Sequence, residues 1–106
     1  MRYIILISLF IIVHNFAYSD DNILSGADVD YGEYLSGECV TCHHKAGLNQ
    51  GIPSINGIDA DVFVALMLAY RSKDMENPVM QMIAGRLDNN QIGSLAIYFS
   101  KLDPPK

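Results

Sequence analysis

The sequence predicts an all-α fold. Apolar residues recur at helical spacing in three stretches, at about residues 30–44, 59–73 and 88–102. The residues between these stretches are rich in glycine, proline, asparagine and charged side chains, which favour loops. No stretch alternates polar and apolar residues for long enough to indicate a β-strand.

The first 19 residues have the layout of a secretory signal peptide. Arg2 supplies a positive charge, and residues 3–13 form an apolar run that contains a single serine. Residues 17–19, Ala-Tyr-Ser, place small side chains where a signal peptidase reads them. A retained anchor is disfavoured because the run is too short, since a spanning helix needs about 20 residues. We therefore expect an exported, periplasmic protein without stable membrane insertion, in which residues 20–106 form one domain.

The chain is acidic, with a net charge of −5. This charge argues against partners such as nucleic acid or anionic lipid. It favours a protein partner with a basic docking surface, although acidity also simply keeps a small exported protein soluble. A domain this short buries little surface, and its two cysteines lie too close together to staple a fold. A large apolar cofactor would supply the missing core.

The first predicted helix covers about residues 30–44 and begins at an aspartate N-cap, Asp28 or Asp30. One face carries residues spaced by four, namely Tyr31, Leu35 and Cys39. Residues 20–29 before it are expected to form a polar lead-in. Residues 45–57 after it are rich in glycine and asparagine and contain a proline, so they are expected to form a loop.

Two further helices follow. The second runs from about Asp59, its N-cap, to residue 73, and it is apolar around much of its circumference, as expected of a helix packed on both protein and cofactor. A charged turn and one short helical turn within residues 78–85 come next. The third helix begins near Asp88, which forms a capping box with Gln91, and ends near residue 102.

The central motif is Cys39-Val40-Thr41-Cys42-His43, which reads C-x-x-C-H. Two thiols at this spacing on one helical turn reach both vinyl groups along one edge of a haem, and the adjacent histidine is then directed at the iron. A thioredoxin-like pair would need a βαβ context, and a zinc site would need a fourth ligand. A disulfide would close too small a loop to stabilise much. The motif and the export signal together predict one covalent haem c with His43 as iron ligand.

The iron needs a sixth ligand or an open face. Met80 follows a loop from which its thioether can turn inward, whereas Met82 faces the other way in a regular helical turn. Residue geometry therefore favours Met80. Met67 lies on an apolar stripe and is expected in the core. His44 is adjacent to His43, cannot cross the ring, and is expected at the surface.

These residues resemble a class I cytochrome c over nearly all of the mature chain, from about residue 32 to residue 102. The resemblance rests on the C-x-x-C-H motif, on a proline loop at residues 51–57, and on a methionine loop and C-terminal helix from Met80 onward. Within that family the likeness is nearest to short c553 and c4 cytochromes and to the cytochrome subunit of flavocytochrome c sulfide dehydrogenase. The points of this nearer likeness are residues 51–55, 70–72 and 79–84.

The resemblance implies a fold of three main helices around one haem, with roles for single residues. Met80 takes the axial position, and the Pro53 carbonyl accepts a hydrogen bond from the second nitrogen of His43, which fixes the ring. Leu35 and Tyr98 pack the first helix against the last. Relatives commonly carry glycine where this chain has His44, and they often carry a basic residue where it has the acidic residues 74–76. The second departure leaves the docking partner open.

The function implied is periplasmic electron transfer by a carrier that catalyses no reaction of its own. A neutral thioether ligand favours ferrous iron and so raises the reduction potential. The alternative is the haem subunit of a flavocytochrome oxidoreductase, docked on a flavoprotein that oxidises sulfide or a similar donor. That alternative predicts a persistent apolar interface near the haem edge. A haem sensor with a labile methionine is a third, weaker hypothesis.

Overall fold

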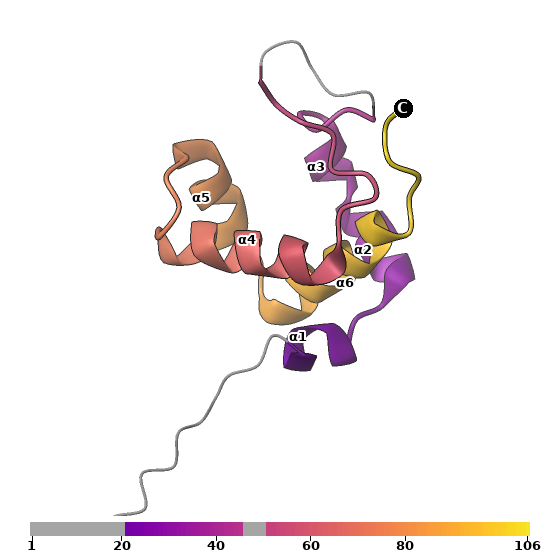
Figure 1. Ribbon diagram of the computed structural model, residues 1–106. Helices are drawn as coiled ribbons and strands as arrows, with labels where there is room; N and C mark the ends of the chain where they lie inside the picture. Colours follow the sequence, from indigo (N-terminus) through magenta and orange to yellow (C-terminus); the bar gives the residue numbers. More distant parts are fainter. Residues whose placement is uncertain (1–20, 46–50) are drawn as a thin grey trace, which may run out of the picture.

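The computed structural model describes residues 21–45 and 51–106, and these residues contain six helices. The helices are α1 (Asp21–Ser25), α2 (Val29–Leu35), α3 (Gly37–Val40), α4 (Ala60–Ser72), α5 (Pro78–Gly85) and α6 (Asn89–Ser100). The described residues form no β-strand, so the predicted all-α class is confirmed for them. Figure 1 shows α4 and α6 crossing in the middle, with α1 below them and with α3 and α5 standing apart above them.

The hydrophobic core lies between α4, α5 and α6. It is formed by buried side chains of these three helices, namely Phe63, Val64, Met67, Ala84, Ile92, Leu95, Ala96 and Phe99. Met67 is 5 % exposed, so its predicted place in the core is confirmed. Phe63 and Phe99 stack with their ring centroids 5.9 Å apart and so join α4 to α6.

The first and last main helices, α2 and α6, cross in close contact. Gly32 makes this possible, because a Cβ atom there would overlap the Ser94 carbonyl oxygen and lie 2.8 Å from Tyr98 Cβ. Ser94 is buried, and its Oγ accepts a hydrogen bond from the Asp28 N–H at 3.1 Å. Two helices therefore approach backbone to backbone, and a polar contact satisfies the buried hydroxyl.

The N-terminal segment of the domain is helical over residues 21–25, so the predicted polar lead-in is wrong there. Ile23 and Leu24 pack against the core, and the Ile23 carbonyl approaches Gly93 so closely that a Cβ atom at position 93 would overlap it. Asn90 Nδ2 donates a hydrogen bond to the Gly26 carbonyl at 3.0 Å. These contacts with α6 stabilise a helix that is too short to persist alone.

The first predicted helix is interrupted at Ser36, so the prediction of one continuous helix over residues 30–44 is wrong. Ser36 Oγ donates to the Glu33 carbonyl at 2.6 Å, and the Ser36 N–H lies within hydrogen-bonding distance of both the Gly32 and Glu33 carbonyls. A serine that bonds its own helix backbone in this way competes with regular helical geometry. The helix restarts at Gly37 as α3. Of the two predicted N-cap residues, Asp28 rather than Asp30 caps α2, since its side chain accepts hydrogen bonds from the N–H groups two and three residues on.

The predicted ends of the two long helices are confirmed to within two residues. Asp59 caps α4 by accepting hydrogen bonds from two N–H groups of its first turn, and Lys73 ends it with φ 67°. Asp88 and Gln91 form the predicted capping box at α6. The intervening helix, α5, has eight residues rather than the single turn expected. Asn77 as N-cap and Pro78 at the first position account for its clear start.

None of the helices described here is long and apolar enough to cross a membrane. The predicted signal peptide, residues 1–19, and the first part of the predicted loop, residues 46–50, lie outside the described residues. The rest of that loop, residues 51–57, is free of helix and strand, as predicted. Its end is fixed to α6 by a hydrogen bond from the Gly57 N–H to the Phe99 carbonyl at 2.9 Å.

Candidate cofactor site

The C-x-x-C-H residues lie on one helical turn that continues beyond α3. The His43 N–H donates to the Cys39 carbonyl at 2.8 Å, and the Cys42 N–H donates to the same carbonyl at 3.2 Å. Residues three and four positions apart on a helix share one face, so both thiols and the imidazole are grouped on one side of the turn. Both cysteines are free; Cys39 is half-buried and Cys42 is exposed.

The imidazole of His43 is held by the proline loop. Its Nδ1 lies 2.7 Å from the Pro53 carbonyl oxygen. A carbonyl only accepts hydrogen bonds, so Nδ1 carries the proton, and in the neutral ring Nε2 keeps its lone pair. This contact spans ten positions of sequence. It depends on the path of residues 51–57, where Gly51 and Gly57 adopt φ angles of 79° and 75°.

Cys39 borders a groove of about 480 Å³ between α2 and α3 on one side and α5 and α6 on the other. Its apolar lining comes from both sides and includes Leu35, Cys39, Ile83, Leu87 and Leu95. Burial here raises the pKa of the Cys39 thiol to about 11, and the neighbouring Glu38 carboxylate adds to this increase. The thiol is therefore neutral at physiological pH, in an apolar setting open enough to admit a reaction partner.

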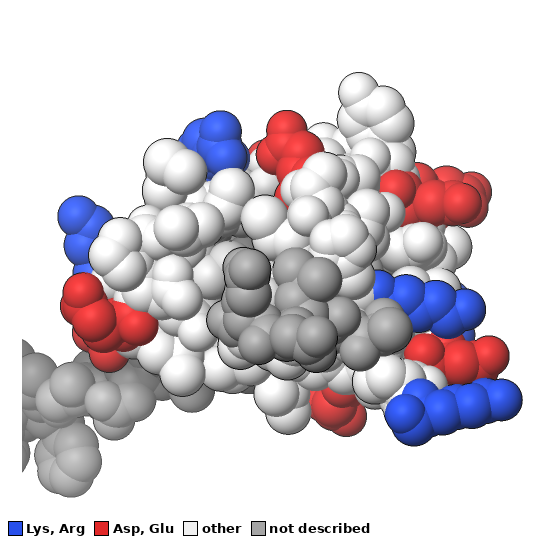
Figure 2. Space-filling model, turned by 90° about the horizontal axis from the view of Figure 1, so that it is seen from above, with Lys and Arg blue, Asp and Glu red and all other residues white. Residues whose placement is uncertain are grey.

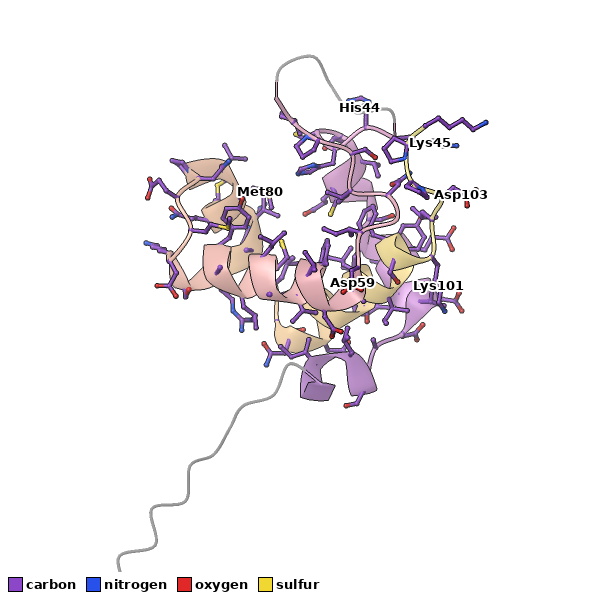
Figure 3. All side chains as sticks on the ribbon, in the orientation of Figure 1. His44, Lys45, Asp59, Met80, Lys101 and Asp103 are labelled. Atoms are coloured by element: carbon purple, nitrogen blue, oxygen red, sulfur yellow. The ribbon has the colours of Figure 1, made fainter. Side chains whose placement is uncertain are left out.

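Met80 lies on α5, the helix that contributes Ile83 to the groove lining. Its N–H donates to the Asn77 side chain at 3.0 Å, and its half-buried side chain packs against the core. Met82 is 58 % exposed. The expected difference in orientation between the two methionines is therefore present. The position of Met80 on α5 is visible in Figure 3.

The two elements that carry the candidate ligands do not touch. No Cα atom of α3 lies within 8 Å of a Cα atom of α5, although α5 contacts α4 and α3 contacts α2. The structure thus groups Cys39, Cys42, His43 and Pro53, and it places Met80 on a separate helix. The groove is lined by Cys39 of α3 and by Ile83 of α5, and neither His43 nor Met80 is among its lining residues.

The remaining candidates lie away from this groove. His44 is exposed, as expected, and Lys45 extends away from α5 in Figure 3. In the described residues, no three or more His, Cys, Asp or Glu side chains gather in a way that would hold a metal ion. The zinc alternative gains no support from this part of the chain.

One well-positioned residue was part of the family likeness but was given no structural role by the sequence analysis. Arg71, in the last turn of α4, donates from Nη1 to the Leu87 carbonyl at 3.2 Å and from Nη2 to Asn89 Oδ1 at 2.7 Å. Both acceptors belong to the connection between α5 and α6, 16 and 18 positions further on. No local pattern indicates so distant a pairing.

The full length of α5 was also missed, although its start was visible in the sequence, because Asn77-Pro78 is a typical helix start.

Comparison of the chain with protein-family models gave no match, and comparison with curated proteins gave no significant match.

Proposed function

We propose that the chain is a mono-haem c-type electron carrier of the periplasm, with haem attached through Cys39 and Cys42. The observation that carries the proposal is the 2.7 Å contact between His43 Nδ1 and the Pro53 carbonyl. This contact leaves Nε2 as the one nitrogen of the His43 ring that is able to bind a metal. His43 directly follows Cys42, and the thiols of Cys39 and Cys42 are both free. This combination suits a tethered haem better than it suits a dithiol redox pair or a zinc site.

The groove and its donors agree with the requirements of such a group. Haem is large and mostly apolar, and the groove beside Cys39 has an aliphatic part, formed by Leu35, Ile83, Leu87 and Leu95, beside polar and charged side chains that include Glu38 and Arg86. A haem iron takes only one or two protein ligands, here His43 and Met80, so it does not need a cluster of three or more metal-binding side chains. A bound haem would also occupy the space between α3 and α5, which do not contact each other, and would so complete a small core.

Each candidate residue has a distinct part in this proposal. A bound haem would supply the one-electron ferric–ferrous couple. Pro53 fixes the ring of His43 and raises the basicity of its Nε2 through the hydrogen bond to Nδ1. Met80 offers a neutral thioether, which favours the ferrous state.

Covalent attachment is the first property to test. The full chain should be expressed in a host that matures c-type cytochromes, then denatured and extracted with acidic acetone. We expect haem to stay with the unmodified protein. Mass spectrometry should show that the single variants Cys39→Ser and Cys42→Ser hold haem through one thioether bond or carry no covalent haem. His43→Gln should lose the native spectrum, whereas His44→Gln, at the adjacent exposed position, should keep it. Complete extraction of haem from the unmodified chain would refute the proposal.

The axial ligand has its own matched pair of variants. Met80→Ala should abolish the red-end absorption band of ferric methionine-ligated haem, and Met82→Ala should leave it, because Met82 is exposed. The opposite result would reassign the ligand to Met82. Rapid carbon monoxide binding by the unmodified ferrous protein would instead favour the sensor hypothesis, since a firmly bound methionine blocks the sixth position.

One observation favours the flavocytochrome alternative. Three exposed apolar side chains belong to the elements that carry the site: Val40 between the cysteines, and Val79 and Met82 beside Met80, with exposed fractions of 42 %, 59 % and 58 %. Figure 2 shows mostly uncharged surface on the side of α5, with charged side chains at its margin. Apolar exposure of this kind is typical of protein interfaces.

Purification of the tagged chain from its native periplasm separates the two functions. Stoichiometric flavin in a co-purifying second protein would make this chain the haem subunit of an oxidoreductase. Haem on a free small protein would support the diffusible carrier. A Val79→Ser/Met82→Ser double variant should release a stable flavoprotein partner if that apolar surface holds it, and Val62→Ser, on the exposed side of α4, is the control.

A further inference from the structure

The side chain of Arg71 links the ends of three helices. It projects from the last turn of α4, and its guanidinium bonds the Leu87 carbonyl, just after α5, and the side chain of Asn89, the first residue of α6. The arginine is half-buried, and the shorter of its bonds is 2.7 Å. A planar guanidinium with two fixed donors holds its partners in one relative orientation more firmly than a single donor does.

The other polar contacts of α5 are local. Asn77 caps its first turn through the Met80 N–H, and Gln81 Nε2 donates to the Met75 carbonyl at 2.9 Å. These bonds shape residues 75–81, and the Met75 N–H, which donates to the Ala69 carbonyl of α4 at 3.1 Å, ties the start of this segment to α4. Arg71, by contrast, joins the C-terminal exit of α5 to α4. Figure 1 shows the chain passing from α5 to α6 beside α4.

From these contacts we propose that Arg71 is a positioning residue for Met80; this inference rests on the proposed haem ligation. Because α5 packs on α4 and makes no contact with α3, its junction with α4 sets how far Met80 lies from His43. A helix rises 1.5 Å per residue, so a tilt of about 10° around the end of α5 displaces Met80 by roughly 1.3 Å. Metal–ligand distances hold to about 0.2 Å, so a shift of that size breaks or weakens the bond.

The test uses purified holoprotein and asks how readily Met80 leaves the iron. Imidazole binds ferric haem only when the sixth position is open, so its apparent affinity reports the fraction of open protein. We expect Arg71→Gln to bind imidazole about tenfold more tightly, because loss of hydrogen bonds from a charged donor commonly changes an equilibrium by that factor or more. The red-end band should weaken, while haem attachment and far-ultraviolet circular dichroism stay the same.

Two further variants distinguish the effect of the paired hydrogen bonds of the Arg71 guanidinium from the effect of its positive charge. Arg71→Lys keeps the positive charge at the end of α4 but loses the planar pair of donors, so it should also raise imidazole affinity. Lys73→Gln removes a positive charge from the same helix end without touching the Arg71 contacts, so it should leave the affinity unchanged. Equal affinity in Arg71→Gln and the unmodified protein, or an equal rise in Lys73→Gln, would overturn the inference.

If Arg71→Gln does not fold, Asn89→Ala replaces it, because that change removes only the acceptor of the 2.7 Å bond. We expect a smaller rise in imidazole affinity, about threefold for the loss of one such bond, and no rise would overturn the inference. Measurements on the unmodified protein distinguish failure of this inference from failure of the proposed haem ligation. If it holds no covalent haem or lacks the red-end band, the proposed ligation itself is wrong, and the inference fails with it.

Discussion

Replacement of Gly32 with alanine should strongly destabilise the fold. A Cβ atom at this position would overlap the carbonyl oxygen of Ser94, and it would lie 2.7 Å from the carbonyl carbon of the same residue. These are backbone atoms of α6, so no side-chain rotation relieves the overlap. The only response is for α2 to move away from α6.

The cost follows from what that movement breaks. Overpacking costs about 1–3 kcal/mol in itself. Separation of α2 from α6 also weakens the Asp28–Ser94 hydrogen bond at 3.1 Å and the Gln91–Tyr31 hydrogen bond at 3.2 Å. Such bonds contribute about 1 kcal/mol each, and the better helix propensity of alanine returns about 0.5–1 kcal/mol. We therefore expect a net loss of about 3 kcal/mol, against a typical total stability of 5–15 kcal/mol.

Thermal unfolding followed by far-ultraviolet circular dichroism measures this loss. For a domain of this size, 3 kcal/mol lowers the Tm by roughly 12–24 °C. Gly85→Ala is the control, because nothing lies within 4 Å of a Cβ atom placed there, and it should be neutral or slightly stabilising. A loss below about 1 kcal/mol in Gly32→Ala would refute the close crossing of α2 and α6.

Three further predictions concern the core, a cap and a thiol. Met67→Ala should cost about 2–5 kcal/mol in urea unfolding, since Met67 is 5 % exposed, and Met75→Ala, at an exposed site, should cost little. Asp88→Ala should cost about 1 kcal/mol by the same assay, whereas Asp88→Ser should retain most of the capping. In the folded haem-free chain, Cys39 should react with iodoacetamide about 100-fold more slowly near pH 8 than a thiol with the ordinary pKa of 9.0, because its pKa is about 11. Its reaction rate should rise with pH up to about 11, and the stability of that form should fall between about pH 9 and 11, where the unfolded chain loses the proton first. Equal labelling of both cysteines at every pH would contradict this burial.

The long helices were predictable because their ends are encoded locally. Asp59 and Asp88 bond N–H groups within three residues of themselves, so residue type and spacing suffice to identify them. The apolar residues of the stripe that contains Met67 likewise recur at helical spacing within their own segment. The C-x-x-C-H turn belongs to the same class, since its internal hydrogen bonds span no more than four residues.

The mispredicted elements depend on contacts that hydrophobic periodicity does not reveal. The helix at residues 21–25 is stabilised by Gly93 and Asn90, more than sixty positions along the chain. The break at Ser36 results from one side-chain hydrogen bond that competes with an otherwise acceptable helical sequence. Local propensity is a weak guide at residues 21–25, because tertiary packing decides the outcome there.

The candidate site likewise has one part that is determined locally and one part that depends on distant contacts. The attachment residues and His43 are fixed by one helical turn and by the loop that carries Pro53, so their geometry depends little on the rest of the fold. Met80, by contrast, is positioned by the packing of α5 on α4, which depends on contacts such as those of Arg71. If haem is bound as proposed, disturbance of the α4–α5 junction should therefore release Met80 from the iron while the covalent attachment persists. Disturbance of the turn at residues 39–43 should remove both, because without the tether nothing holds a haem between the two helices.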